Sequence, residues 1–242
     1  MLAIKTDKLT KKFGQRTVVD ALDLLVEKGE LFSLLGVNGA GKTTILKMLS
    51  CISKPTSGDA YLSGESILSN PQKVKRLINV SPQETAIAPN LSVKENLELI
   101  AGIYSDNNKT VKEDVDQMIV TLKLQEVENS KAKILSGGWQ RRLSIAMALI
   151  TKPEILFLDE PTLGLDVLAR RELWTIIKNL RGEITIILTT HYMEEAEALS
   201  DRIGIMFEGK LKVVGTAKEL ITEAKAENFE DAFVKFATKE GK

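Results

Sequence analysis

Two short glycine-rich stretches of this chain have residues suited to binding phosphate. The first runs from Gly36 to Thr43 and is a full match to the pattern G-x-x-x-x-G-K-[ST]. Its glycines leave backbone N–H groups free to close around phosphates, Lys42 would neutralise β- and γ-phosphate charge, and the Thr43 hydroxyl can bind Mg²⁺. The stretch therefore predicts a nucleotide site. The residues expected to contact the nucleotide are Gly36, Asn38, Gly39, Ala40, Gly41, Lys42, Thr43 and Thr44.

The second stretch, Leu135–Trp139, reads Leu-Ser-Gly-Gly-Trp. Two glycines leave N–H groups bare, Ser136 adds a hydroxyl donor, and a helical pattern begins directly afterwards. This combination suits an anion held at a helix N-terminus. The chain thus has two elements for binding phosphate, almost a hundred residues apart, and the sequence raises the question of why it needs both.

An acidic pair follows a buried strand in the second half of the chain. Ile155–Leu158 is an apolar run typical of a parallel strand, and Asp159 and Glu160 come directly after it. Ligands of doubly wound sheets bind at such strand ends. Acidic residues there are often only a solvated turn, but a complete phosphate loop upstream favours catalysis. Asp159 suits Mg²⁺ and its water, while Glu160 is placed to polarise an attacking water as general base.

Two further polar residues come after predicted strands. His191 is the only histidine and follows the apolar strand at residues 184–189; its imidazole could contact a γ-phosphate or order the attacking water. A lone histidine is usually structural, so its predicted role depends on its place beside the nucleotide. Gln83 follows a short strand at residues 78–80, and its amide could reach Mg²⁺ or water while marking a hinge in the chain.

The elements that would position these residues alternate in α/β order. From Leu91 to about Ile150 the spacing of apolar residues is purely helical. After Ile150 the sequence again predicts alternating strands and helices. The simplest architecture is one α/β domain over residues 1–242, with a helical insert at about 84–152 and a helical tail at about 216–242. We predict strands at 2–9, 18–26 (joined through a turn at Phe13-Gly14), 31–35, 57–64, 78–80, 155–158, 184–189, 203–206 and 210–214, and helices at 44–49, 92–104, 110–124, 138–150, 167–181, 193–199, 216–225 and 229–238.

Composition narrows the class of protein. The 33 Lys and Arg residues balance 33 Asp and Glu residues, so nothing indicates a surface that coats nucleic acid. Cys51 is the only cysteine, which excludes a disulfide framework and fits a reducing cytosol. No apolar run approaches the roughly 18 residues of a membrane span, and residues 1–5 are no signal peptide. We expect a soluble intracellular protein.

In their order along the chain, these motifs resemble those of the ATP-binding subunit of ABC transporters, over nearly all of residues 2–237. The resemblance implies a P-loop NTPase (RecA-like) α/β core with an N-terminal antiparallel β subdomain and an inserted α-helical subdomain. It also implies ATP and Mg²⁺ as cofactors, with Phe13 stacking on adenine. The motifs are the phosphate loop at 36–43, the glutamine loop at Gln83, the signature at 135–139, the acidic motif at 155–160, the D-loop Leu163–Asp166 and the switch His191.

The resemblance implies an answer to the question of the second stretch. In this family two subunits pack head to tail, and each nucleotide lies between one subunit's phosphate loop and the other's signature. Ser136, Gly137 and Gly138 would then contact a γ-phosphate held by a second ATP-binding subunit, with Asp166 across the same interface. A homodimer is permitted because the catalytic set is complete. A separate transmembrane permease would hold the protein on the cytoplasmic face of the cell membrane, and no nucleic-acid partner is implied.

Within the family, the segment at residues 190–197 resembles the drug-resistance and sodium-export subfamily, which favours export. The transported substrate is not encoded here, because in this architecture the membrane subunit selects it. The alternatives are a non-transport ABC ATPase acting on ribosomes or DNA, and a soluble phosphotransferase. Two residues depart from the family pattern: Trp139 replaces the usual signature glutamine, with Gln140 one place later, and Leu163 replaces a small polar D-loop residue.

Overall fold

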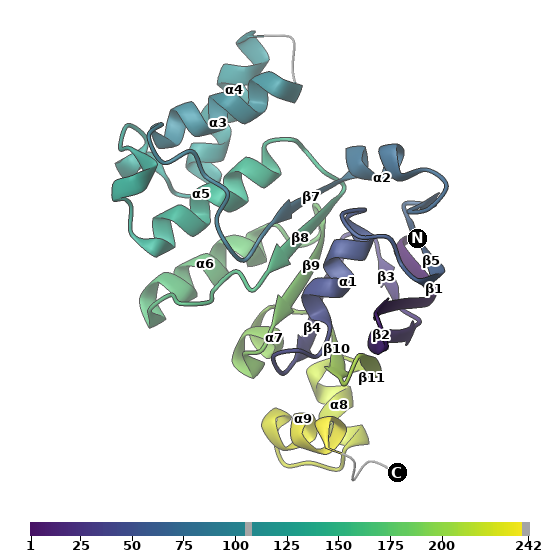
Figure 1. The fold of residues 1–242 in the computed structure, drawn as a ribbon. Helices are drawn as coiled ribbons and strands as arrows, with labels where there is room; N and C mark the ends of the chain where they lie inside the picture. The colour runs from purple at the N-terminus through teal and green to yellow at the C-terminus, as the bar shows by residue number, and fades with distance from the viewer. Residues whose placement is uncertain (105–107, 239–242) are drawn as a thin grey trace.

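The computed structural model describes residues 1–104 and 108–238 of the chain. Its centre is a six-stranded sheet in which five neighbouring strands are parallel and the strand at one edge is antiparallel (Figure 1). In spatial order the strands are β11 (Lys210–Gly215), β10 (Arg202–Phe207), β4 (Leu31–Gly36), β9 (Thr185–Thr190), β8 (Ile155–Asp159) and β7 (Ile78–Ser81).

Both faces of this sheet are covered, which explains why its central strands are mainly apolar: every residue of β4, β8 and β9 is buried. Successive side chains point to opposite faces. Phe157 packs with residues of α1 (Lys42–Leu49), whereas Leu156 and Leu158 pack with those of α5 (Gly137–Leu149) and α6 (Val167–Asn179). The sheet therefore separates two hydrophobic cores. Helix α7 (Met193–Leu199) contacts β4 and β9.

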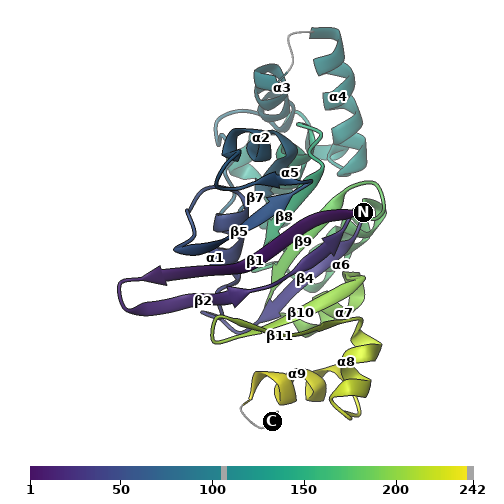
Figure 2. The ribbon, with the colours of Figure 1, turned by 90° about the vertical axis from the view of Figure 1, so that its right-hand side faces the viewer.

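A smaller antiparallel sheet packs over α1 and is built around the long strand β1 (Leu2–Phe13) (Figure 2). The prediction of one strand over 18–26 is wrong, because β2 (Arg16–Leu22) pairs with the end of β1 and β3 (Leu25–Glu27) pairs with its start. The break follows a left-handed residue, Ala21, at φ 45°. The turn at Phe13-Gly14 is confirmed. A hairpin of β5 (Ser57–Leu62) and β6 (Glu65–Ser66) completes this sheet.

Helices fill the chain between β7 and β8 and project from the edge of the large sheet (Figure 1). Helix α5 packs against β7 and β8, while α3 and α4 lie farther out (Figure 1). The predicted helices at 92–104, 110–124 and 138–150 are present with slightly different ends. The elements are α3 (Val93–Tyr104), α4 (Asn108–Thr121), the 3-10 turns η1 (Gln125–Val127) and η2 (Ala132–Ile134), and α5.

The C-terminal helices α8 (Ala217–Glu223) and α9 (Phe229–Ala237) lie at the opposite end of the molecule and pack beside β10 and β11 (Figure 1). Thr216 and Glu219 form a capping box that starts α8. Residues 239–242 of the expected tail lie outside the described residues. Within the part of the chain that the structure describes, no helix is both long and apolar enough to cross a membrane.

Candidate functional site

The phosphate loop connects the buried strand β4 to α1. At two of its positions no residue other than glycine fits. Gly41 adopts φ +103°, and a Cβ there would lie 2.7 Å from the carbonyl oxygen of Val18. A Cβ at Gly36 would lie 2.4 Å from the carbonyl oxygen of Met206. The neighbouring backbones of β2 and β10 thus press against the loop. Contacts within this chain therefore fix the backbone path of the loop at these two glycines.

Lys42 is buried at the start of α1, with its ammonium inside the loop. Its Nζ donates hydrogen bonds to the carbonyl oxygens of Gly36 (2.6 Å) and Val37 (3.3 Å) and lies 3.6 Å from Oε1 of Glu160. Burial lowers the pKa of Lys42 below its usual value, and the negative charge of Glu160 opposes that shift. The carbonyl groups of the loop and the carboxylate of Glu160 together stabilise the charge of Lys42.

The acidic pair occupies the end of β8, as the sequence predicts. Asp159 accepts hydrogen bonds from the hydroxyls of Thr43 (3.2 Å) and Thr189 (2.5 Å) through the same oxygen. This contact joins the phosphate loop to two neighbouring strands of the sheet. It brings together two of the three residues expected at Mg²⁺, and the third, Gln83, lines a cavity together with Thr43. In residues 1–104 and 108–238 no group of three His, Cys, Asp or Glu side chains is arranged to hold a metal ion.

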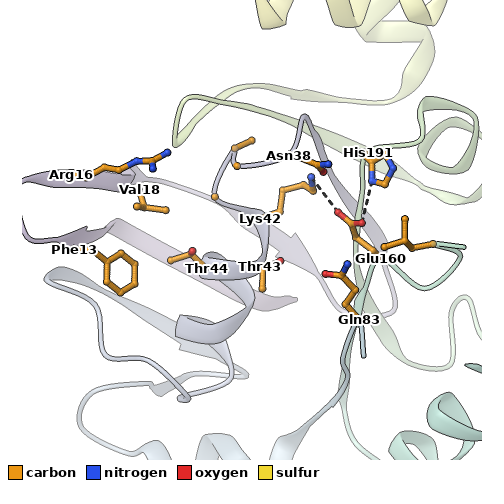
Figure 3. Close-up of a pocket in the computed structure, with 14 residues that line it drawn as sticks. Phe13, Arg16, Val18, Asn38, Lys42, Thr43, Thr44, Gln83, Glu160 and His191 are labelled. Atoms are coloured by element: carbon orange, nitrogen blue, oxygen red, sulfur yellow. Dashed lines mark ion pairs between the residues drawn. The ribbon is translucent and has the colours of Figure 1, made fainter. Parts of the chain in front are cut away.

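Glu160 lies one residue beyond the strand in a left-handed conformation, at φ 46°. Its N–H group donates to the backbone oxygen of Thr189 (3.1 Å), which fixes the turn. Its carboxylate lies between two nitrogens: Oε1 faces Lys42, and Oε2 is 3.1 Å from Nδ1 of His191 (Figure 3). A non-glycine residue rarely adopts this backbone, and such strain gathers at functional sites.

A cavity of about 580 Å³ opens beside these groups. Phe13 lies at the end opposite Glu160 and His191, with its ring 57% exposed (Figure 3). Exposed Gln83, just after β7, lines the catalytic end. The separation between the ring and the charged groups suits a ligand with an aromatic base at one end and phosphates at the other. The lining residues are Phe13, Arg16, Val18, Asn38, Gly39, Ala40, Gly41, Lys42, Thr43, Thr44, Gln83, Glu160, Leu163 and His191.

The residues of the second stretch do not line this cavity. Ser136 and Gly137 are exposed at the N-terminus of α5, and Gly138 is partly buried. Asp166 caps α6, where its carboxylate accepts hydrogen bonds from the N–H groups of Leu168 and Ala169 (2.9 Å each). In a single chain, the site residues predicted from the sequence therefore lie in two separate places, one around the cavity and one at the N-termini of α5 and α6.

Trp139 packs against its own chain. The guanidinium of Arg142 lies 4.6 Å from the centre of its ring, and the ring borders the core beneath α5. Gln140 turns toward the preceding loop, where its side-chain amide donates to the carbonyl oxygens of Leu135 (3.2 Å) and Ala132 (3.3 Å). The indole thus contacts the helical insert, and the neighbouring glutamine secures the approach to the glycines.

Sequence reasoning missed several residues at the cavity. Thr189 holds Asp159 and the turn at Glu160, and its only signal was a hydroxyl near the carboxyl end of a buried strand. Arg16, Val18 and Leu163 line the cavity without belonging to the predicted nucleotide contacts. The spacing of residues in the sequence did not indicate Arg16 and Val18 of β2, because pairing with the long strand β1 determines where they lie.

Comparisons with known proteins agree with this geometry. The sequence profile described as "ABC transporter" matches residues 19–163. The daunorubicin resistance ATP-binding protein DrrA3 of Streptomyces coeruleorubidus is 37% identical over 222 residues, which cover 91% of this chain and 70% of that protein. The human phospholipid-transporting ATPase ABCA3 is 40% identical over 218 residues, 88% of this chain but only 13% of the relative. A dimeric ATP-binding cassette bound to ADP and Pi superimposes with a TM-score of 0.79 and 27% identity, covering 88% of this chain and 98% of the other.

Proposed function

This chain belongs to the ABC transporter family, and we propose that it hydrolyses ATP in the cavity beside Lys42 to drive export through a separate membrane subunit. One observation carries the proposal: four groups with distinct catalytic uses converge on one cavity, whose far end carries an exposed aromatic face at Phe13. They are Lys42, Gln83, Glu160 and His191.

Lys42 and Glu160 have the largest roles. The Lys42 ammonium neutralises β- and γ-phosphate charge, for which it leaves its partners within the protein. Its departure frees Oε1 of Glu160, and that oxygen then accepts a proton from the attacking water. His191 keeps its contact with the other carboxylate oxygen, so the base stays oriented while it takes the proton.

Thr43 and Asp159 would hold Mg²⁺, with the amide of Gln83 as a further ligand. The first two already present oxygens 3.2 Å apart at the end of the phosphate loop, and hard oxygen ligands are those that Mg²⁺ prefers. The ion commonly takes only one or two protein ligands besides phosphate oxygens and water, which fits this donor set. When bound, it supplies charge neutralisation at the β- and γ-phosphates.

We further propose that a second ATP-binding subunit covers the cavity with its Ser136, Gly137 and Gly138. Exposure of the first two supports this, because N–H groups at a helix N-terminus are anion donors without a ligand in their own chain. The related cassette bound to ADP and Pi is dimeric. We infer the membrane subunit and its position on the cytoplasmic face from membership of the family, and the direction of transport from a relative named as a Nod factor export ATP-binding protein.

The test is the substitution Glu160→Gln, which keeps the size of the side chain but removes its basicity. We expect hydrolysis to fall by about 10²–10⁴-fold, while ATP with Mg²⁺ converts the protein from monomer to a stable dimer. Steady-state phosphate release and light scattering after size exclusion measure the two effects. Glu223→Gln makes the same change on the exposed face of α8 and should alter neither. Hydrolysis at the wild-type rate in Glu160→Gln, or a protein that stays monomeric with ATP, would contradict the proposal.

A further inference from the structure

Arg141, on the second turn of α5, is a buried cation that does not line the nucleotide cavity. Only 5% of the residue is exposed. Its guanidinium grips the backbone just after β7: Nη1 donates to the carbonyl oxygen of Pro82 (2.6 Å) and Nη2 to that of Gln83 (2.5 Å). The glutamine loop is therefore hydrogen-bonded directly to α5.

The arrangement needs arginine in particular. Burial lowers the pKa of Arg141 from its usual value, and the negative charges of Asp159 and Glu195 counter that shift. Among the described residues no carboxylate lies within ion-pair distance of it. Its donors are used on two successive carbonyl groups instead. A planar fork matches two neighbouring acceptors, whereas the single ammonium of lysine cannot span both with the same geometry.

A second buried contact reinforces the same junction. The hydroxyls of Ser144 and Ser81 lie 2.9 Å apart. Ser144 follows Arg141 by three residues and so lies on the same face of α5. Ser81 is the last residue of β7, directly before the two carbonyl groups that Arg141 holds. The strand end and the glutamine loop are thus both fixed to one helix.

The N-terminus of that helix, one turn before Arg141, is the half-site proposed to face a second subunit. Gly138 precedes Arg141 by three residues, about 4.5 Å along the helix axis. Gln140 secures the loop before the glycines through its bonds to the carbonyl groups of Leu135 and Ala132. A single turn of rigid helix therefore separates the surface that would meet the partner's nucleotide from the backbone that carries Gln83 into this chain's own cavity.

We propose that Arg141 is a positioning residue that couples the two nucleotide sites of the dimer. Docking of the helix N-terminus on the partner's γ-phosphate moves or stiffens α5, and the paired hydrogen bonds carry that change to Gln83. Each site then completes its catalytic geometry only when the other is filled. This inference rests on the proposed function, because it requires the dimer.

The substitution Arg141→Met tests the coupling, since methionine fills similar space without the two donors. In the full chain we expect a Hill coefficient for ATP that falls from above 1 to about 1, because two uncoupled sites show no cooperativity. We expect kcat to fall by about tenfold and the KM for ATP to change less than about twofold, since the residue does not touch nucleotide. Arg141→Lys should behave similarly, because it keeps the charge but loses one of the two bonds.

The matched control is Arg202→Met, which removes an arginine that pairs with Glu30 and the carbonyl oxygen of Leu25 rather than with the glutamine loop or α5. The Hill coefficient of this control should equal that of the wild-type protein, even if its melting temperature changes. Equal loss of cooperativity in both variants would overturn the proposal, as would unchanged cooperativity in a folded Arg141→Met or Arg141→Lys protein. Each variant is also made with Glu160→Gln: if ATP still assembles that dimer, failure of the coupling leaves the proposed function standing.

Discussion

The two glycine-rich stretches differ in what requires their glycines. In the phosphate loop the protein itself requires them: Gly41 is left-handed, and the Val18 carbonyl group leaves no room for a Cβ. In the signature, Gly137 has no positive φ, and a Cβ would meet only Leu165, at an ordinary 3.8 Å. No contact within this chain demands glycine at 137, whereas a Cβ at Gly138 would lie 3.1 Å from that of Ala169. In the dimer proposed above, the demand for glycine at 137 comes from the partner's nucleotide, and in this a half-site would differ from a complete site.

The largest effect should follow Gly41→Ala. Alanine at φ +103° is strained, and its Cβ would press on the Val18 carbonyl oxygen, so the loop must open. We expect ATP affinity to fall by more than about 100-fold, together with a lower melting temperature. Titration with a fluorescent ATP analogue and thermal unfolding measure the two. Normal affinity would mean that the loop tolerates a shift of β2.

Gly137→Ala should give the opposite pattern. The substitution fits within the chain, and alanine favours helix over glycine, so the melting temperature should hold or rise slightly. ATP binding to the monomer should persist, whereas hydrolysis should fall by about 10–100-fold because the new methyl group stands where the partner's phosphate must approach.

Gly102→Ala is the matched control for that variant, since an added Cβ on α3 meets no atom within 4 Å. It should leave hydrolysis unchanged. If Gly137→Ala hydrolyses ATP as fast as Gly102→Ala, the signature glycines have no ligand and the comparison between the two stretches fails.

The smallest expected effect belongs to Phe13→Ala, at the open end of the cavity. Loss of an aromatic face should weaken ATP binding by about 2–10-fold without changing kcat, because the ring is remote from Glu160. Binding of an ATP analogue and steady-state kinetics separate the two quantities. Leu25→Ala, which removes an exposed side chain from β3 of the same sheet, serves as control. Equal affinity in both variants would make Phe13 a surface residue only.

The central strands could be predicted from the sequence because they are buried on both faces. β4, β8 and β9 are buried throughout because helices or strands cover both faces, so their mainly apolar runs are visible without the structure. Helix α2 (Pro71–Leu77) was missed because Val74 is its only buried residue, and one apolar position makes no period. The division of residues 18–26 was missed because β1, not the local sequence, decides where pairing stops.

The site was predictable to the extent that motifs are local. The loop at 36–43 and the acidic pair could be read directly; residues 38–43 and Glu160 line one cavity, and Asp159 contacts Thr43 beside it. Thr189 and Arg141 could not be found, because their contacts depend on the register of β8 beside β9 and on the packing of α5 against β7. Both hold functional residues through the backbone or through a second side chain. Such contacts leave no recognisable pattern of spacing in the sequence.

The contacts of Lys42 within its own chain also bear on how long a nucleotide stays. ATP exchanges the bonds to Gly36 and Val37 for phosphate contacts, so the free energy of binding is reduced by what the lysine gives up. A site with a bare ammonium would hold ATP and ADP more tightly and release them more slowly. In many enzymes release of product limits the cycle. Because its lysine already has partners within the loop, we expect ADP to leave this site sooner than it would leave a bare ammonium.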